Sequence, residues 1–115
     1  VPIVTGYVNK EFIRNELFDF IVSLQDDDFW SNQITQIHVY PNLDVELIPR
    51  VGSHIIYLGS VKNAQQKLAK LFTFYKEGLP RVGWNRYTRI DLRYRDQVVC
   101  VKPEPAPEPE IKIEN

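Results

Sequence analysis

The chain of 115 residues is most informative in what it lacks: it has one cysteine, no methionine and no long apolar run. The single cysteine, Cys100, excludes an internal disulfide and every zinc site built from several cysteines. Crossing a bilayer takes about 20 consecutive apolar residues, and no stretch of the sequence offers them. Because the sequence starts at Val1 without an initiator methionine, we expect a fragment or a processed chain.

A strong net charge is also missing, since 14 basic and 15 acidic residues leave −1. That value is the sum of two segments of opposite net charge. Residues 103–115 hold four of the eight prolines and four glutamates against one lysine, a net charge of −3, which leaves +2 on residues 1–102. Alternating prolines remove backbone donors and favour extended chain. We therefore predict a folded domain over residues 1–102 and a flexible Pro/Glu-rich tail over residues 103–115.

The apolar pattern within residues 1–102 changes between helical and strand periods several times. Asn9 is the expected N-cap of a helix that ends near Gln25, and Ser60 that of a second helix that ends at Gly78, before Pro80. The strands are predicted at residues 34–40, 45–50, 54–58, 89–95 and 97–102. Strands in runs, separated by two amphipathic helices, predict an α+β fold with a mainly antiparallel sheet.

Catalytic and metal-binding patterns are missing from the sequence. His38 and His54 are 16 residues apart with no third ligand at metal spacing, so we interpret both as ordinary strand residues. Cys100 lies between Val99 and Val101, which favours a small apolar strand residue over a nucleophile. No glycine-rich phosphate loop is present. We therefore expect no enzymatic activity, no metal and no cofactor.

The strongest candidate for function is a group of arginines beside aromatic residues. Its members are Arg81, Trp84, Arg86, Tyr87, Arg89, Arg93 and Arg95. Three interpretations stay open: a solvated strand face, a surface for an acidic protein partner, and a nucleic-acid site in which arginines bind phosphates and aromatic rings stack on bases. The low charge of the folded part, +2, weakens the last of these.

The final predicted strand has apolar side chains on both faces, at Val98, Val99, Cys100 and Val101. A last strand at a sheet edge exposes unpaired backbone N–H and C=O groups, which favour pairing with another chain. We expect the backbone donor of Val99 to be one of them, so that a proline there would abolish partner binding and spare the fold. The tail would discourage unspecific edge pairing.

These segments, in this order, resemble the β domain of the FtsQ/DivIB family of cell-division proteins. The resemblance runs through Asp44–Arg50, His54–Ser60 and Tyr87–Tyr94 and covers essentially all of residues 1–102. Gly83-Trp84-Asn85 and Ile90-Asp91-Leu92-Arg93-Tyr94 match most specifically. Because the family carries this domain beyond a membrane anchor and a POTRA domain, the resemblance implies that the chain is the distal part of a longer protein.

The resemblance further implies a non-catalytic scaffold of the divisome that serves septum formation. Family proteins are single-pass proteins of the inner membrane with this domain on the periplasmic side, and they bind FtsB and FtsL, FtsB by strand addition. An arginine after the hairpin, here Arg50, contacts acidic residues of the partner. The candidate partner-binding residues are Arg50, Arg89, Arg93, Tyr94, Gln97, Val98, Val99, Cys100 and Val101.

Overall fold

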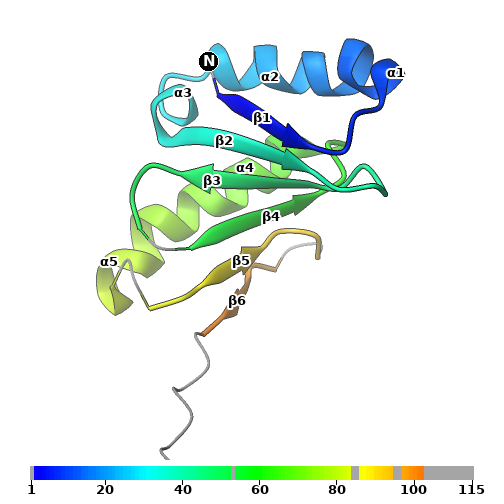
Figure 1. Cartoon of the computed structure of the whole chain (residues 1–115). Coiled ribbons are helices and arrows are strands. Elements are labelled where there is room, and N and C mark those ends of the chain that lie inside the picture. The colour runs from blue at the N-terminus through cyan, green and yellow to red at the C-terminus, as the bar shows by residue number, and fades with distance from the viewer. Residues whose placement is uncertain (1, 53, 84–85, 95–96, 103–115) are drawn as a thin grey trace, which may run out of the picture.

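The computed structural model describes residues 2–52, 54–83, 86–94 and 97–102. Its strands are β1 (Ile3–Gly6), β2 (Ile34–Val39), β3 (Val45–Pro49), β4 (Ile55–Gly59), β5 (Arg89–Asp91) and β6 (Val99–Val101). They form one six-stranded sheet in sequence order, from β1 at one edge to β6 at the other (Figure 1). The pairs β1–β2 and β4–β5 are parallel, and the other three are antiparallel. The predicted α+β class with a mainly antiparallel sheet is confirmed.

Two long helical stretches cover one face of this sheet. The first consists of α1 (Lys10–Phe12), a π-helical segment (Ile13–Leu17) and α2 (Phe18–Gln25), and the short α3 (Trp30–Gln33) follows it. The second consists of α4 (Ala64–Thr73), a π-helical segment (Phe74–Gly78) and α5 (Leu79–Val82). In Figure 1, α4 crosses behind β3 and β4, whereas α2 lies beside β1. The π turns matter because they rotate the following residues relative to an α-helical pattern.

The hydrophobic core lies between these helices and the covered face of the sheet. Alternate strand residues point into it, as strand geometry requires. From the strands the core takes Ile37, Val39, Val45, Leu47, Ile56, Leu58, Ile90 and Leu92, and from the helices Phe12, Leu17, Phe20, Leu24, Trp30, Leu68, Leu71, Tyr75 and Leu79. The opposite face of the sheet carries the polar and aromatic side chains that position the candidate site.

The first predicted helix is confirmed, including its cap. The Asn9 side chain accepts a hydrogen bond from the Phe12 backbone N–H at 3.0 Å. The π-helical segment spaces the buried Phe12 and Leu17 by five residues, and Ile13 between them is 36 % exposed.

The second helix departs from its predicted bounds at both ends. It begins at Ala64 after Asn63, and the Ser60 side chain instead accepts a hydrogen bond from the N–H of Lys62. It also continues through Gly78 and Pro80 to Val82. Pro80 is tolerated because it lies in the first turn of α5, where the missing N–H has no intrahelical partner to lose. The prediction that Gly78 ends this helix was wrong.

Two further differences concern the strands. β1 was not predicted, although it pairs with β2 over four residues. The predicted strand over residues 89–95 is shorter, since β5 ends at Asp91. Tyr94 therefore lies beyond the strand and is 48 % exposed, rather than sharing the buried face of Ile90 and Leu92. The predicted tail, residues 103–115, lies outside the described residues.

Candidate functional site

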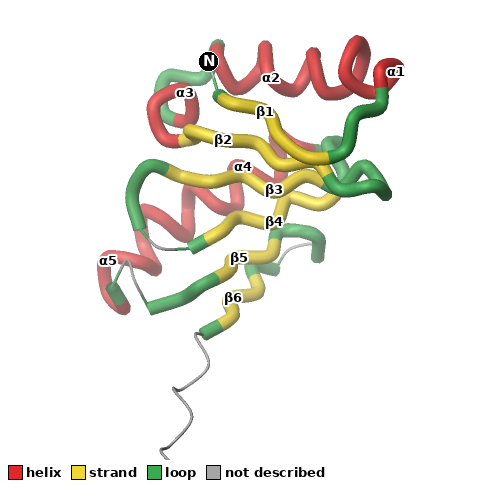
Figure 2. The backbone as a smooth tube through the Cα atoms, in the orientation of Figure 1, coloured by secondary structure: helices red, strands yellow, loops and turns green. Residues whose placement is uncertain are grey.

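The last strand, β6, lies at an edge of the sheet (Figure 2), and it spans Val99–Val101 rather than the predicted residues 97–102. It pairs antiparallel with β5 through three residue pairs, Arg89 with Val101, Ile90 with Cys100, and Asp91 with Val99. Its other side meets no strand of the described sheet. The edge available for pairing with another chain is therefore three residues long, bounded by Gln97 and Val98 before it and Lys102 after it.

The hydrogen bonds of β5 determine which backbone groups of β6 face outward. Leu92 N–H donates to the Tyr57 carbonyl of β4 at 3.0 Å, and the Thr88 carbonyl accepts from Ile55 N–H at 2.9 Å. The Thr88 N–H instead donates to the Val101 carbonyl of β6 at 2.8 Å. Within β5, backbone groups alternate between the two neighbouring strands, so Ile90 bonds to β4 and Arg89 and Asp91 bond to β6.

It follows that their partners Val101 and Val99 direct their backbone groups inward, toward β5. Cys100, between them, directs its N–H and C=O outward. This register differs from the expectation for Val99: its donor belongs to the internal ladder, so we expect a proline at Val99 to disrupt the edge strand itself. The outward donor of the strand is that of Cys100.

The side chains of β6 alternate between the core face and the open face of the sheet. Cys100 lies against the core and is half-buried, and burial raises the pKa of its thiol. A raised pKa keeps the thiol protonated, which agrees with the interpretation of Cys100 as a packing residue. Val99 and Val101 lie on the open face, 37 % and 45 % exposed. They form the apolar part of the surface that a paired strand would meet.

Beside this edge, Arg93 forms an ion pair with Asp91. Arg93 Nη2 lies 2.7 Å from Asp91 Oδ2, and Arg93 Nε donates to both carboxylate oxygens at 3.1 Å. Asp91 is only 5 % exposed. Its burial alone would raise the pKa of the carboxyl, but the hydrogen bonds and charge of Arg93 outweigh burial and hold this pKa below its ordinary value. Arg93 therefore stabilises a buried carboxylate as well as contributing a partly exposed positive charge.

Tyr57 of β4 brings the two candidate arginines together on the open face. The guanidinium carbon of Arg89 lies 4.3 Å from the centre of the Tyr57 ring, and that of Arg93 lies 4.6 Å from it. The Tyr57 hydroxyl donates to Asp44 at 2.6 Å, and burial together with that bond raises the pKa of Tyr57 to about 12. Cation–π contact thus fixes two positive charges next to β6.

Lys70 of α4 forms hydrogen bonds with backbone carbonyls that follow β5 and precede β6. Its Nζ donates to the carbonyls of Tyr94 at 2.5 Å, Gln97 at 3.1 Å and Leu92 at 3.3 Å. No local pattern signals such a contact, because the three carbonyls lie 22 to 27 residues away in sequence.

The same lysine lines a hollow between α4 and the segment after β5. Its volume is about 810 Å³, and its lining includes three basic residues and no acidic one. The lining residues are Asn63, Gln66, Lys67, Ala69, Lys70, Thr73, Leu92, Arg93 and Tyr94. We call this the basic pocket. The pocket contains Arg93 and Tyr94, which were predicted to bind a partner. It also contains Lys67 and Lys70, for which the sequence predicted no binding role.

Arg50 is the one predicted binding residue that lies apart from this group. It follows β3, and its N–H donates to the Gln33 carbonyl at 2.6 Å. Both β4 and β5 separate β3 from β6. At about 4.8 Å per strand, this places Arg50 roughly 14 Å from the edge. The other predicted residues, from Arg89 to Val101, are neighbours in space.

The structure offers little for catalysis or for nucleic acid. His54 is 2 % exposed and its Nε2 lies 2.5 Å from the Tyr75 hydroxyl, which identifies it as a core residue. Among the described residues, no three His, Cys, Asp or Glu side chains are grouped to hold a metal. Tyr57 is 8 % exposed beneath two guanidiniums and cannot stack on a base. Of the predicted nucleic-acid cluster, Trp84, Arg95 and the Arg81 side chain lie outside the described part.

The fold is that of an α+β domain whose six-stranded mixed sheet ends in the free edge strand β6. In the comparison with protein families, residues 1–101 match the model of the family described as FtsQ/DivIB, C-terminal related. The chain belongs to this family, whose members are membrane-anchored, non-enzymatic proteins of the division machinery, and it has a role in cell division. The comparison with curated proteins found no match. None of the described helices is long and apolar enough to span a membrane.

Proposed function

We propose that this domain is a non-catalytic scaffold of the divisome that binds FtsB- and FtsL-type partners by strand addition to β6. The observation that carries the proposal is the free edge of β6, with the N–H and C=O of Cys100 directed outward. An extended partner segment paired there would continue the sheet and satisfy these groups. Through such contacts the domain would recruit or regulate septal cell-wall synthesis.

Backbone pairing over three residues is too short to select one partner, so side chains must supply specificity. Val99 and Val101 offer apolar contacts on the open face. Arg89 and Arg93 are held beside them by the Tyr57 ring. Carboxylates on the partner strand would pair with these arginines or enter the basic pocket, which favours an acidic partner over a neutral one.

Gln97, Val98 and Tyr94 would meet the end of the partner segment that lies near the basic pocket. Arg50 requires a longer partner. It can bind a carboxylate only if the partner chain continues past the ends of β5 and β4, a further 14 Å or so at the spacing of sheet strands. We therefore expect Arg50 to matter for long partner segments and to be dispensable for short ones.

The proposed location is supported by the family. Its members are membrane-anchored division proteins. We propose that this domain lies on the periplasmic side of the inner membrane, held by a single N-terminal anchor, which is where partners of the FtsB and FtsL type would meet it.

The test compares two prolines placed at equivalent positions on opposite edges. Cys100→Pro removes the outward donor of β6. Val4→Pro removes the outward N–H donor of β1. The Tyr7 N–H bonds to the Val39 carbonyl of β2, and because backbone groups alternate along the strand, the Val4 N–H points away from β2. Proline is tolerated where an edge N–H faces solvent. Cys100→Ala, which keeps the donor, controls for the lost thiol.

Binding to the extracytoplasmic FtsB–FtsL complex is measured by calorimetry, with thermal melts to confirm folding. We expect Cys100→Pro to weaken binding by about 100-fold, or about 2.7 kcal/mol. Val4→Pro and Cys100→Ala should stay within about twofold of the parent, since neither removes an edge donor of β6. Unchanged affinity in folded Cys100→Pro would contradict strand addition at this edge.

A further inference from the structure

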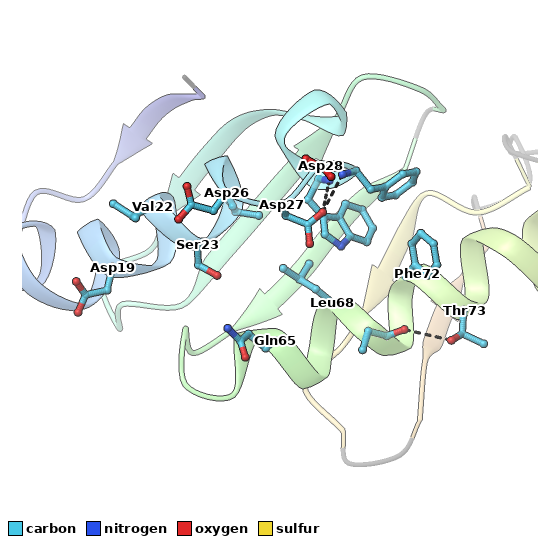
Figure 3. A pocket seen from close by; sticks show the side chains of 14 residues that line it. Asp19, Val22, Ser23, Asp26, Asp27, Asp28, Gln65, Leu68, Phe72 and Thr73 are labelled. Atoms are coloured by element: carbon cyan, nitrogen blue, oxygen red, sulfur yellow. Dashed lines mark hydrogen bonds between the residues drawn. The ribbon is translucent and has the colours of Figure 1, made fainter.

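A second hollow lies on the other side of α4, between that helix and the end of α2 with α3 (Figure 3). Its volume is about 1040 Å³. The walls come from Asp19, Val22, Ser23, Leu24, Asp26, Asp27, Asp28, Phe29, Trp30, Gln65, Leu68, Ala69, Phe72 and Thr73. We call this the acidic groove. It is separate from the edge of β6 and plays no part in the function proposed above.

Several of the residues that line the acidic groove are apolar. Leu24, Trp30 and Leu68 form buried parts of its wall. Val22 and Phe72 are 38 % and 39 % exposed. They come from α2 and α4, so the groove presents an exposed apolar side chain on each of its two helical walls. Exposed apolar side chains around a hollow mark a surface suited to binding.

The charged residues that line the groove are all acidic, although Lys76 Nζ lies 6.0 Å from the centre of the Phe72 ring. The walls contain four aspartates, three of them in the run Asp26–Asp28, and neither lysine nor arginine. None of the four forms an ion pair within the described part of the chain. Asp27 accepts hydrogen bonds from the N–H groups of Phe29 and Trp30 at 2.9 Å, so it has a structural role. No such role is seen for Asp26 or Asp28 among the described residues.

The position of Asp26 is unfavourable for the helix that it ends. Asp26 is the C-cap of α2, whose last turn contains no basic residue. Negative charge at a helix C-terminus adds to the negative end of the helix dipole. Positive charge brought by another molecule would relieve this repulsion. The described residues hold no cluster suited to a metal ion, so a bound cation does not account for the aspartates.

We propose that the acidic groove binds a basic amphipathic helix of a partner protein. Such a helix would lay its apolar side chains between Val22 and Phe72 and direct lysines or arginines toward Asp19, Asp26 and Asp28. The volume reaches the upper limit of small-molecule sites, and two helical walls suit an elongated apolar occupant. The chain's own residues 103–115 are a poor occupant, because their net charge is −3.

The probe is a synthetic amphipathic Leu/Lys helix, with a Leu/Glu helix of the same pattern as its control. Binding is measured by calorimetry at low and high salt, and the site is mapped from amide chemical shifts. Asp26→Asn combined with Asp28→Asn removes two charges and keeps Asp27 in place. Glu11→Gln combined with Glu77→Gln removes two exposed charges outside the groove. Val22→Lys, at an exposed position, introduces a positive charge into the wall.

We expect the Leu/Lys helix to bind at least about tenfold more tightly than the Leu/Glu helix at low salt. The aspartate double variant and Val22→Lys should each weaken binding of the Leu/Lys helix about tenfold. The glutamate double variant should weaken it by less than about twofold. Equal binding of both peptides, or shifts confined to β6, would overturn the proposal. Self-association of the chain that Val22→Lys abolishes would assign the groove to a second copy instead. Val22→Lys should still bind FtsB–FtsL, so the two proposals fail separately.

Discussion

The two edges of the sheet, β1 and β6, offer a partner the same backbone chemistry in different surroundings. Each has an outward donor, at Val4 and at Cys100, and each exposes apolar side chains. Ile3 is 66 % exposed on β1, and Val101 is 45 % exposed on β6. The strand β1 carries no charged residue, whereas Arg89, Arg93 and the basic pocket lie beside β6.

This difference distinguishes the features that let a sheet edge pair with any extended chain from those that let it select one partner. Unpaired N–H and C=O groups attract any extended chain, and an apolar edge adds unspecific contact. Fixed positive charges next to the edge restrict the choice to strands with carboxylates in register, and they accelerate the encounter. On this reasoning β6 is the recognition edge.

Val99→Pro should have the largest effect, because it damages β6 from the inside. The Val99 N–H belongs to the ladder with Asp91, so proline removes a bond within the sheet. We expect about 3 kcal/mol of lost stability and no measurable FtsB–FtsL binding. Chemical denaturation and calorimetry report the two losses. A stable Val99→Pro domain that binds normally would show that the backbone alternation assigned to β6 is wrong.

Gly6→Ala should destabilise the opposite edge without affecting binding. Gly6 has φ of +99°, and an added Cβ would collide with the Val39 carbonyl oxygen of β2. A cost of about 2 kcal/mol is expected from strain and displacement of β1. Gly83→Ala is the matched control, since Gly83 has φ of +100° and open space around it. Urea unfolding should show the greater loss for Gly6→Ala, with partner affinity unchanged in both.

Asp91→Asn should change how stability depends on pH. The folded-state pKa of Asp91 is lowered, so its contribution is present above the ordinary carboxyl pKa of about 4 and is lost as pH falls through the folded value. The asparagine variant should be about 1 to 3 kcal/mol less stable at pH 7, because Arg93 loses its charged partner. The difference from the parent should shrink below pH 4. Denaturant melts at pH 7, 5 and 3 measure this difference in the free energy of unfolding. A difference that stays constant with pH would contradict the pairing of Asp91 with Arg93.

Arg89→Gln should have the smallest effect. It removes one positive charge beside β6 and leaves the Arg93–Asp91 pair intact. We expect association with an acidic partner to slow by about three- to fivefold at low salt and by less at high salt. Stopped-flow measurements across a salt series test this. Lys10→Gln, on the β1 side of the domain, should leave the rate unchanged, and equal slowing by both would indicate general charge attraction.

The sequence predicted best those elements whose pattern is local. Strand composition bounded by turn signals located β2, β3 and β4, and helical spacing with the Asn9 cap located the first helix. β1 was missed because its four residues gain their strand character from pairing with β2, some 33 positions later. The extension of the second helix was missed because a π turn allows Gly78 and Pro80 inside a helical stretch, against their usual meaning.

The candidate site was predictable in part for a similar reason. The apolar last strand and the alternation of Arg89, Asp91 and Arg93 are visible in the sequence. The direction of the Cys100 backbone depends on the register between β5 and β6, and the bonds of Lys70 depend on how α4 packs. Neither is encoded in spacing along the chain. The acidic groove likewise exists only where α2 and α4 meet.

Amide hydrogen exchange in the free domain and in its complex with FtsB–FtsL tests whether a partner strand pairs with β6. Strand addition at β6 predicts that the Cys100 amide, exposed to solvent in the free domain, becomes protected by about tenfold or more in the complex. The Val4 amide of β1 should exchange at the same rate in both states. Protection at Val4 with none at Cys100, or protection at neither, would contradict the account.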